Sequence, residues 1–217
     1  MKQDVINTFD TSNFHMLCNA LAKKDAALQA VLDAYGYPPL WSREPNFATL
    51  IHIILEQQVS LASAKAAFVQ LRNTLGTITP QQILLLSDEE LKACYFSRQK
   101  IVYARHLSQA VIEGKLVIEQ LEHLPNQKVQ ETLLKIKGIG HWTVDVFLMM
   151  CLHRCDCFPL GDIALIKSVK EVKDFPATTS KEQIELLAQK WKPYRTIAAF
   201  MLWHAYLQKR NIVYQQP

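Results

Sequence analysis

Apolar side chains recur along this chain at intervals of three and four residues, the spacing that places them on one face of an α-helix. One such stretch follows Pro45 and Asn46 and contains Phe47, Leu50, Ile51, Ile54 and Leu55. A second begins after Ser60 and continues to Gly76. Regular alternation of apolar and polar residues, the signal of a strand, is scarce. The pattern predicts an all-α protein.

Small polar residues and prolines mark where further helices should begin. Thr79 and Pro80 start a short helix, while Ser87–Glu90 and Ser180–Gln183 both resemble capping boxes. Other helices are expected over 97–114, 126–136, 141–152, 162–173 and 193–209, with two more before Gly36. About ten helices with short connections predict one compact helical domain over residues 1–217.

Composition and charge narrow the class of protein only slightly. The chain has 217 residues, of which 49% are hydrophobic and 20% charged, and its formal net charge is +4. This mild basic bias permits nucleic-acid binding without establishing it. The first residues lack the regions of a signal peptide, and no apolar run approaches the roughly 18 residues of a membrane span. We expect a soluble protein with no membrane partner, and a monomer because heptad repeats are absent.

The cysteines predict a reducing compartment. They are Cys18, Cys94, Cys151, Cys155 and Cys157. An odd number at irregular spacing does not fit a secreted disulfide framework. The last three are close enough to raise the question of a metal site, but their spacing is not C-x2-C and no second pair follows. We expect an intracellular protein, cytoplasmic if its source is bacterial and nuclear if eukaryotic.

The strongest chemical signal is the segment Leu133–Thr143, which reads LLKIKGIGHWT. Gly138 and Gly140 free the backbone for positive φ, so that the turn can direct N–H groups at an anion beside the start of the next helix. Lys135 and Lys137 would add attraction for phosphate. The alternative for an isolated G-x-G is an ordinary helix–helix turn.

The longer string and four other segments resemble the HhH-GPD superfamily of DNA glycosylases, and most closely the 3-methyladenine DNA glycosylase II family. The hairpin of that family reads L-x-x-I/L-x-G-I-G-x-W-T-A. The segments that match family motifs in the same order are Glu56–Ser60, Phe96–Lys100, Leu133–Thr143, Phe158–Asp162 and Trp191–Thr196. The resemblance extends from about residue 45 to residue 207 and implies a two-lobed helical fold, with the helix-hairpin-helix at about residues 126–152 and no N-terminal β domain.

The resemblance identifies Asp162 as the catalytic carboxylate, because family members carry an aspartate after a Gly/Pro-rich loop some twenty residues past the hairpin tryptophan. In isolation Asp162 would be read as a helix N-cap, and the two roles can coexist. A carboxylate facing the sugar would stabilise the positive charge that builds as the base departs.

The residue at the position of Trp142 distinguishes two kinds of superfamily member. Members that also cleave the DNA backbone carry a lysine there, whose amine forms a Schiff base with the sugar. Tryptophan cannot form an imine, so we expect no lyase activity. Iron–sulfur members carry four cysteines after the catalytic domain, whereas no cysteine follows Cys157 here. We expect no iron–sulfur cluster and no required cofactor.

Recognition of the base is expected to involve aromatic faces. Alkylated purines are cationic and should stack well on indole. Trp142 directly follows the hairpin, and by resemblance Trp203 would stack on the flipped base, although each tryptophan could equally be a core residue. Asp145 could add a polar contact or simply face solvent. Some relatives have a pocket tyrosine where this chain has Val146.

The remaining expected contacts are with damaged double-stranded DNA. By resemblance Gln58, or failing that Gln57, fills the hole left by base flipping; both amides could instead cap helices. The residues expected to bind DNA are Gln57, Gln58, Lys135, Lys137, Gly138, Ile139, Gly140, His141 and Thr143. The family hairpin also holds a monovalent cation, Na⁺ or K⁺, through backbone carbonyls that correspond to Leu134, Ile136 and Ile139 here.

Taken with the resemblance, these features predict a monofunctional glycosylase that excises flipped alkylated purines, of the 3-methyladenine or 7-methylguanine type, in base excision repair. One alternative is a non-catalytic helix-hairpin-helix DNA-binding protein, which the aspartate argues against. Another is a glycosylase for oxidised or deaminated bases. A helical scaffold with chance glycine turns would not explain several motifs in order.

Overall fold

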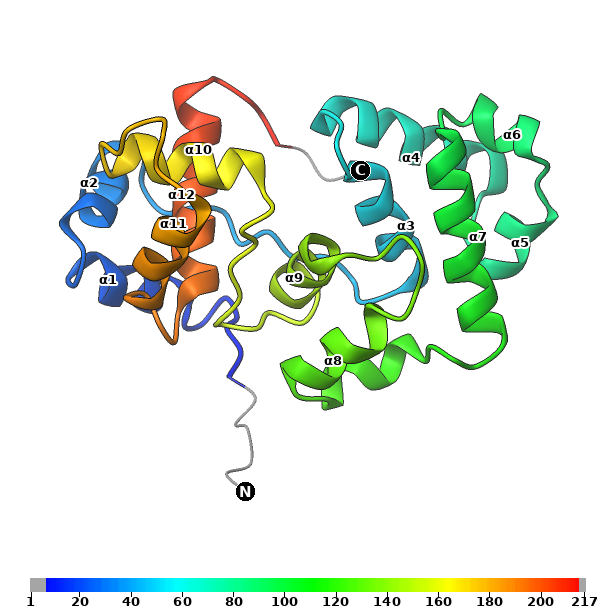
Figure 1. The fold of residues 1–217 in the computed structure, drawn as a ribbon, viewed down its shortest axis with the longest axis horizontal. Helices are drawn as coiled ribbons and strands as arrows, with labels where there is room; N and C mark the ends of the chain where they lie inside the picture. The colour runs from blue at the N-terminus through cyan, green and yellow to red at the C-terminus, as the bar shows by residue number, and fades with distance from the viewer. Residues whose placement is uncertain (1–6, 215–217) are drawn as a thin grey trace. The chain divides into compact units, whose positions relative to one another are not determined.

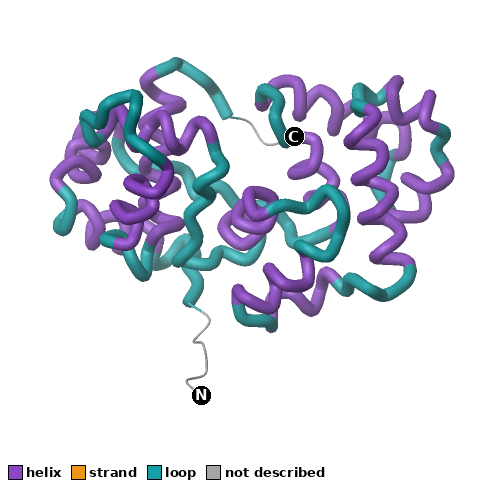
Figure 2. Tube along the Cα trace, viewed as in Figure 1, coloured by secondary structure: helices purple, strands orange, loops and turns teal. Residues whose placement is uncertain are grey.

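The computed structural model describes residues 7–214, and every regular element within them is a helix (Figures 1 and 2). The helices are α1 (Phe14–Ala22), α2 (Ala26–Tyr35), α3 (Phe47–Glu56), α4 (Leu61–Leu75), α5 (Pro80–Leu85), α6 (Asp88–Ala93), α7 (Arg98–Ile112), the 3₁₀ helix η1 (Ile118–His123), α8 (Asn126–Leu133), α9 (His141–Met150), α10 (Ile163–Val172), α11 (Lys181–Gln189) and α12 (Arg195–Lys209). Extended backbone pairs in this range at one isolated bridge, between Thr8 and Arg154. The all-α prediction is confirmed.

The described chain divides into two compact units. Unit 1 contains the residues up to Ser42 together with Leu148–Tyr214, and unit 2 contains Arg43–Phe147. The chain passes from unit 1 to unit 2 after Ser42 and returns within α9.

Unit 1 is built around α12. The ten consecutive residues Thr196–Ala205 are buried, as expected for a helix that is covered on all sides. Helices α1, α2 and α10 pack against it (Figure 1). An aromatic cluster fills the space between these elements and consists of Phe9, Phe14, Trp41, Phe200 and Trp203. Contacting rings of this kind contribute beyond the area they bury, so α12 is a rigid base for whatever it holds.

Unit 2 is built around α3, in which every residue from Leu50 to Leu55 is buried. Helices α4 and α7 pack on α3, and α5 and α6 pack on α7. Two charged groups are buried with this core: Arg43 forms a two-pronged ion pair with Glu56, at 2.7 and 2.9 Å. Because Glu56 is the last residue of α3, its ion pair with Arg43 fixes the start of the segment that follows.

The polar residues expected at helix starts perform that role. Side chains of Asn46, Ser60, Thr79 and Ser97 accept hydrogen bonds from backbone N–H groups in the first turns of their helices. The two capping boxes, at Ser87–Glu90 and Ser180–Gln183, are confirmed.

The largest differences from the sequence-based expectation are one helix end and one short helix. The helix expected over 126–136 ends at Leu133, and the next residues form a turn. Ile136 is nevertheless buried, so its side chain continues the apolar period after the helix has ended. The short helix η1 was not predicted, because six residues are too few to establish a helical period.

None of the helices in the described residues is long and apolar enough to cross a bilayer. All five cysteines are buried, and none of them forms a disulfide within the described residues. Burial raises the pKa of the Cys18 thiol to about 12 and that of Cys155 to about 11. Cys18 and Cys155 are therefore packing residues rather than nucleophiles.

Candidate functional site

Asp162 ends a tight loop and begins α10. Its backbone N–H donates to the carbonyl of Pro159 at 2.8 Å, and the N–H of Leu160 donates to that of Phe158 at 2.9 Å. The side-chain oxygen Oδ1 accepts the N–H of Leu165 at 2.7 Å, which is the capping bond expected from the sequence. The carboxylate is half-buried, so it is both fixed in place and within reach of solvent.

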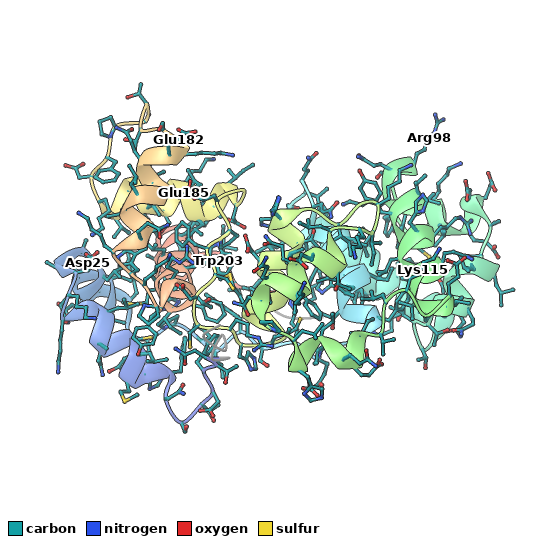
Figure 3. All side chains as sticks on the ribbon, turned by 60° about the horizontal axis from the view of Figure 1, so that its bottom comes forward. Asp25, Arg98, Lys115, Glu182, Glu185 and Trp203 are labelled. Atoms are coloured by element: carbon teal, nitrogen blue, oxygen red, sulfur yellow. The ribbon has the colours of Figure 1, made fainter. Side chains whose placement is uncertain are left out.

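Trp203 makes a second bond to the same oxygen. Its indole N–H donates to Oδ1 of Asp162 at 3.1 Å, and the residue is only 8% exposed. Figure 3 shows Trp203 among the interior side chains of unit 1, whereas Glu182 and Glu185 point outward from α11. Trp203 therefore orients the carboxylate; its expected stacking on a flipped base stays a prediction.

The hairpin expected at 126–152 consists of α8, a turn and α9. In the turn, the N–H of Ile139 donates to the carbonyl of Ile136 at 3.0 Å, with Gly138 between them at φ +97°. A Cβ on Gly138 would lie 2.1 Å from Cγ of Tyr103. Both the backbone angle and the approach of α7 require glycine at this position.

Gly140 differs from Gly138, and the expectation that both would adopt positive φ was wrong. Its φ lies outside the left-handed region, and a Cβ there would meet nothing within 4 Å. Its carbonyl accepts the N–H of Val144 at 3.1 Å, so Gly140 is the residue from which α9 begins. The open space above Gly140 leaves the first turn of α9 accessible to a ligand.

The other residues of the hairpin are exposed, half-buried or buried. Lys135, Lys137 and His141 are exposed, whereas Ile139 and Thr143 are buried. Trp142 and Asp145 are half-buried, and Val146 is buried. The His141 ring also bonds to the side-chain amide of Gln130 at 3.0 Å. The exposed members can meet a phosphate directly, while the buried ones shape the turn.

The Glu56–Ser60 segment separates into distinct roles. Glu56 pairs with Arg43, and Ser60 caps α4. The Gln57 amide donates to the carbonyl of Gly138 at 2.8 Å and to the hydroxyl of Thr143 at 2.9 Å. Gln58 is exposed and has φ +57°. One glutamine thus braces the hairpin and its neighbour faces solvent at the tip of the turn.

The Phe96–Lys100 segment also contributes to this region of unit 2. Ser97 caps α7, and the Lys100 ammonium donates to the carbonyl of Leu55 at 2.6 Å. Burial lowers the pKa of Lys100. This bond joins the start of α7 to the end of α3, just before the two glutamines. Sequence reasoning missed this contact and that of Tyr103, since partners so distant along the chain leave no local pattern.

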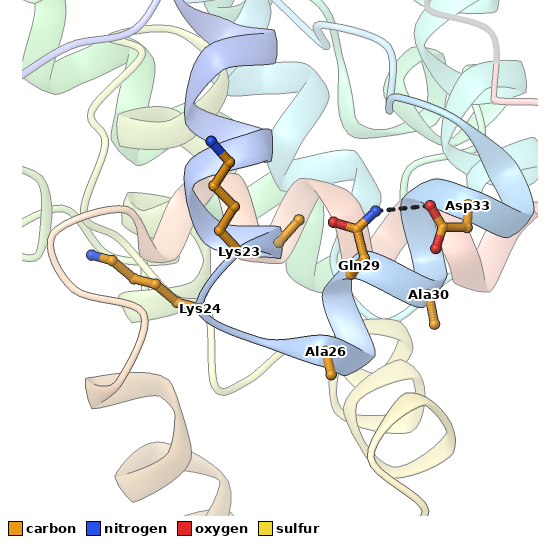
Figure 4. Close-up of a pocket in the computed structure, with 7 residues that line it drawn as sticks. Lys23, Lys24, Ala26, Gln29, Ala30 and Asp33 are labelled. Atoms are coloured by element: carbon orange, nitrogen blue, oxygen red, sulfur yellow. Dashed lines mark hydrogen bonds between the residues drawn. The ribbon is translucent and has the colours of Figure 1, made fainter.

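Two surface depressions are lined by residues other than Asp162. One, of about 560 Å³, is in unit 1 between α1 and α2 and is lined by Lys23, Lys24, Gln29, Asp33 and alanines (Figure 4). It is open and contains none of the predicted site residues. The other, of about 300 Å³, is in unit 2 and includes Val59, Tyr95 and Lys100. It borders the loop that carries Gln58.

The backbone carbonyls expected to hold a cation can be tested for fit. Ile136 accepts the bond from Ile139, while within residues 7–214 the carbonyls of Leu134 and Ile139 accept no backbone hydrogen bond of the turn. Carbonyl oxygens are suitable ligands for Na⁺ and K⁺. Across the whole described range, 7–214, no group of three or more His, Cys, Asp or Glu side chains could hold a metal ion.

Comparison with known proteins identifies relatives of this chain. The chain is 26% identical over 206 residues to DNA-3-methyladenine glycosylase 1 of Schizosaccharomyces pombe, covering 93% of this chain and 90% of the relative. It is 27% identical over 187 residues to the putative DNA-3-methyladenine glycosylase YfjP of Bacillus subtilis, covering 82% of this chain but only 65% of that protein. The expected resemblance to this class is confirmed.

A solved structure agrees with these sequence relatives. The Schizosaccharomyces pombe 3-methyladenine DNA glycosylase in complex with abasic DNA superposes with a TM-score of 0.81 at 30% identity, covering 87% of this chain and 95% of that one. A family model described as the HhH-GPD superfamily base excision DNA repair protein matches residues 51–193. The chain therefore belongs to the HhH-GPD superfamily of base excision DNA repair proteins.

Proposed function

We propose that this protein is a monofunctional DNA glycosylase that excises alkylated purines from duplex DNA with Asp162 as the catalytic carboxylate. The observation that carries the proposal is the position of Asp162, half-buried at the end of its loop and held through Oδ1 by Leu165 and Trp203. One relative described above is named a DNA-3-methyladenine glycosylase and the other a putative one, which supports the choice of substrate.

The hairpin would bind the DNA backbone. Helix α9 offers the N–H groups of its first turn and the positive end of its dipole to a phosphate, and the open space at Gly140 allows close approach. Exposed Lys135 and Lys137 add attraction that depends on salt but not on base sequence. If the hairpin holds Na⁺ or K⁺, the carbonyls of Leu134, Ile136 and Ile139 would be its ligands, and the ion would add positive charge that attracts phosphate.

Gln58 is the better candidate to fill the space left by the flipped nucleotide. It is exposed at the tip of its turn, whereas the Gln57 amide is occupied by the hairpin. Flipping costs a few kcal/mol, and less where damage has already weakened pairing. Insertion of Gln58 would offset part of that cost by replacing lost stacking contacts.

The reaction would be hydrolysis of the glycosidic bond. The bond between C1′ and the purine nitrogen breaks, its electron pair leaves with the base, and a cationic methylated purine departs as a neutral molecule. The Asp162 carboxylate stabilises the positive charge on the sugar. Water then adds its oxygen to C1′ and loses a proton to the carboxylate or to solvent, leaving an abasic site.

Base recognition would rely on cation–π stacking, for which Trp142 and Trp203 each offer an indole, with Asp145 as a further polar contact. A base that is already cationic is a good leaving group, so a strong general acid is not needed. Trp142 also stands where lyase members carry their lysine. The product should therefore be an intact strand with an abasic site.

The test is release of free bases from methylated duplex DNA, with the strand examined before and after alkali. We expect 3-methyladenine or 7-methylguanine in the supernatant and strand breaks only after alkali. Breaks before alkali would contradict the monofunctional assignment. Absence of released methylpurines together with release from oxidised or deaminated substrates would assign a different lesion, and tight DNA binding with no release from any substrate would indicate a non-catalytic protein.

A further inference from the structure

We propose that Arg195 and Thr196 are positioning residues for Asp162. They belong to the Trp191–Thr196 segment, to which the sequence assigned no role. The first turn of α12 holds one end of the loop Arg154–Asp162, and Trp203 of the same helix holds the other. This inference rests on the proposed function, because it takes Asp162 as the catalytic group.

Thr196 is the centre of the first anchor. Its hydroxyl donates to the carbonyl of Arg154 at 2.5 Å and accepts the N–H of Cys157 at 3.0 Å. Its own N–H donates to the carbonyl of Cys155 at 2.9 Å. The residue is fully buried, so the loop backbone cannot replace these bonds with water without first leaving the core. Thr196 therefore sets the path of three residues of the loop, two through its hydroxyl and one through its backbone N–H.

Arg195 adds a charged clamp beside Thr196. Its Nε donates to Oδ1 of Asp156 at 2.7 Å, and its Nη2 donates to Oδ2 at 3.0 Å and to the Asp156 carbonyl at 3.3 Å. A guanidinium that binds a carboxylate with two prongs fixes orientation as well as distance. Lysine could supply the charge at this position but not the planar geometry.

The opposite edge of the loop is held by the N-terminal segment. The carbonyl of Asn7 accepts the N–H of Cys155 at 3.0 Å, and the N–H of Phe9 donates to the carbonyl of His153 at 3.0 Å. Residues 153–157 thus lie between an extended strap and the start of α12. A loop held from two sides cannot adjust when one side is removed without also distorting the other.

Between Asp156 and Asp162, the loop packs against Trp191 through Phe158. The Phe158 ring lies 5.7 Å from the Trp191 ring. Trp191 is itself held, since its indole N–H donates to Asp25 at 2.8 Å. Burial raises the pKa of Asp25, but hydrogen bonds from Lys173 and Trp191 outweigh it, and the net pKa is lowered. The carboxylate therefore stays ionised and keeps the anchor in place at neutral pH.

Both anchors stand on one rigid helix. Trp203 follows Arg195 by about two turns, and the buried face of α12 fixes the separation of the two points. A displacement of about 1 Å at a reacting centre can lower a rate by about a hundredfold. Loss of the Thr196 anchor should therefore reduce the chemical step without weakening DNA binding, which the hairpin provides.

The experiment compares Thr196→Val, which keeps the shape of the side chain but loses the hydroxyl, with Thr196→Ser, which keeps the hydroxyl. Each folded variant is assayed on methylated duplex DNA for its single-turnover excision rate at saturating protein, and on abasic-site DNA for its dissociation constant. We expect the excision rate of Thr196→Val to fall about tenfold or more, with its dissociation constant within about twofold of wild type. Thr196→Ser should recover most of the rate.

Arg195→Gln provides an independent test on a partly exposed side chain, and decides the question if Thr196→Val does not fold. It should lower the excision rate while leaving abasic-DNA binding unchanged. The inference would be overturned if both variants excised bases at rates within about twofold of wild type. If Thr196→Val is unfolded, the same result for Arg195→Gln alone would overturn it. The proposed function would stay intact in either case. An inactive wild type would instead overturn the proposed function, and this inference with it.

Discussion

Trp203 donates its indole N–H to Oδ1 of Asp162, the same oxygen that caps the first turn of α10. One carboxylate oxygen thus links the central helix of unit 1 to the helix that Asp162 begins. Two donors on one oxygen restrict rotation of the carboxylate before any substrate arrives. Preorganisation of this kind is what makes a fixed charge effective in stabilising a transition state.

Replacing Trp203 with phenylalanine tests this link, because phenylalanine keeps an aromatic face but has no N–H. We predict an excision rate about tenfold lower, which corresponds to about 1.4 kcal/mol in the barrier. The matched control is Trp41→Phe, which removes an indole from the same aromatic cluster. Equal single-turnover rates for the two variants would contradict an orienting role for Trp203.

The two hairpin glycines should respond differently to alanine. Gly138→Ala combines a positive φ with a clash against Tyr103, and we predict a loss of about 2–4 kcal/mol in the free energy of unfolding. Gly140→Ala meets open space and should cost less than about 1 kcal/mol. The added methyl group should instead weaken binding to abasic DNA. Urea unfolding measures the loss of stability, and a titration with abasic DNA measures the loss of binding. Similar stability losses in Gly138→Ala and Gly140→Ala would refute the different roles given to the two glycines.

The two glutamines of the Glu56–Ser60 segment form another matched pair. Gln57→Ala removes two hydrogen bonds to the hairpin and should lower the free energy of unfolding by about 1–2 kcal/mol. Gln58→Ala removes an exposed side chain and should leave it within about 0.5 kcal/mol of wild type, while slowing excision from duplex DNA. The prediction would be contradicted if Gln58→Ala lowered the free energy of unfolding and Gln57→Ala slowed excision without lowering it.

Stability should fall in mild acid because of His52. Burial lowers the pKa of His52 from 6.5 to about 4, although nearby Glu56 opposes the shift. Between these values the unfolded chain binds a proton that the folded chain does not, so stability is complete above pH 6.5 and declines toward pH 4. The expected loss between pH 7 and pH 5 is about 2 kcal/mol. Denaturant unfolding at both pH values, with His52→Gln as control, measures this contribution, and an unchanged pH dependence in the variant would disprove it.

Much of the fold could be predicted because its signals are local. Ser60, Ser87 and Ser180 cap helices that begin where the apolar period starts, and a cap acts within three residues. Asp162 was predicted as a cap for the same reason, and its role as a catalytic residue came from the resemblance. The end of α8 was misplaced because Ile136 points its side chain inward from a turn rather than from a helix.

The contacts that hold the candidate site in place could not be predicted in the same way. Gln57 contacts Gly138 across 81 positions, and Thr196 contacts Arg154 across 42. Neither partner carries a pattern that points to the other, so these pairs emerge only from the fold. The glutamines and the Trp191–Thr196 segment were recognised as motifs, but which glutamine braces the hairpin required the structure.

The most direct test of the central claim is single-turnover excision from methylated duplex DNA by Asp162→Asn. Asparagine caps a helix about as well as aspartate, so the variant should fold and bind abasic DNA as wild type does, while the charge is lost. We predict an excision rate reduced by about a hundredfold or more. Release of methylpurines by Asp162→Asn at the wild-type rate would show that Asp162 is only a helix cap and that the catalytic group lies elsewhere.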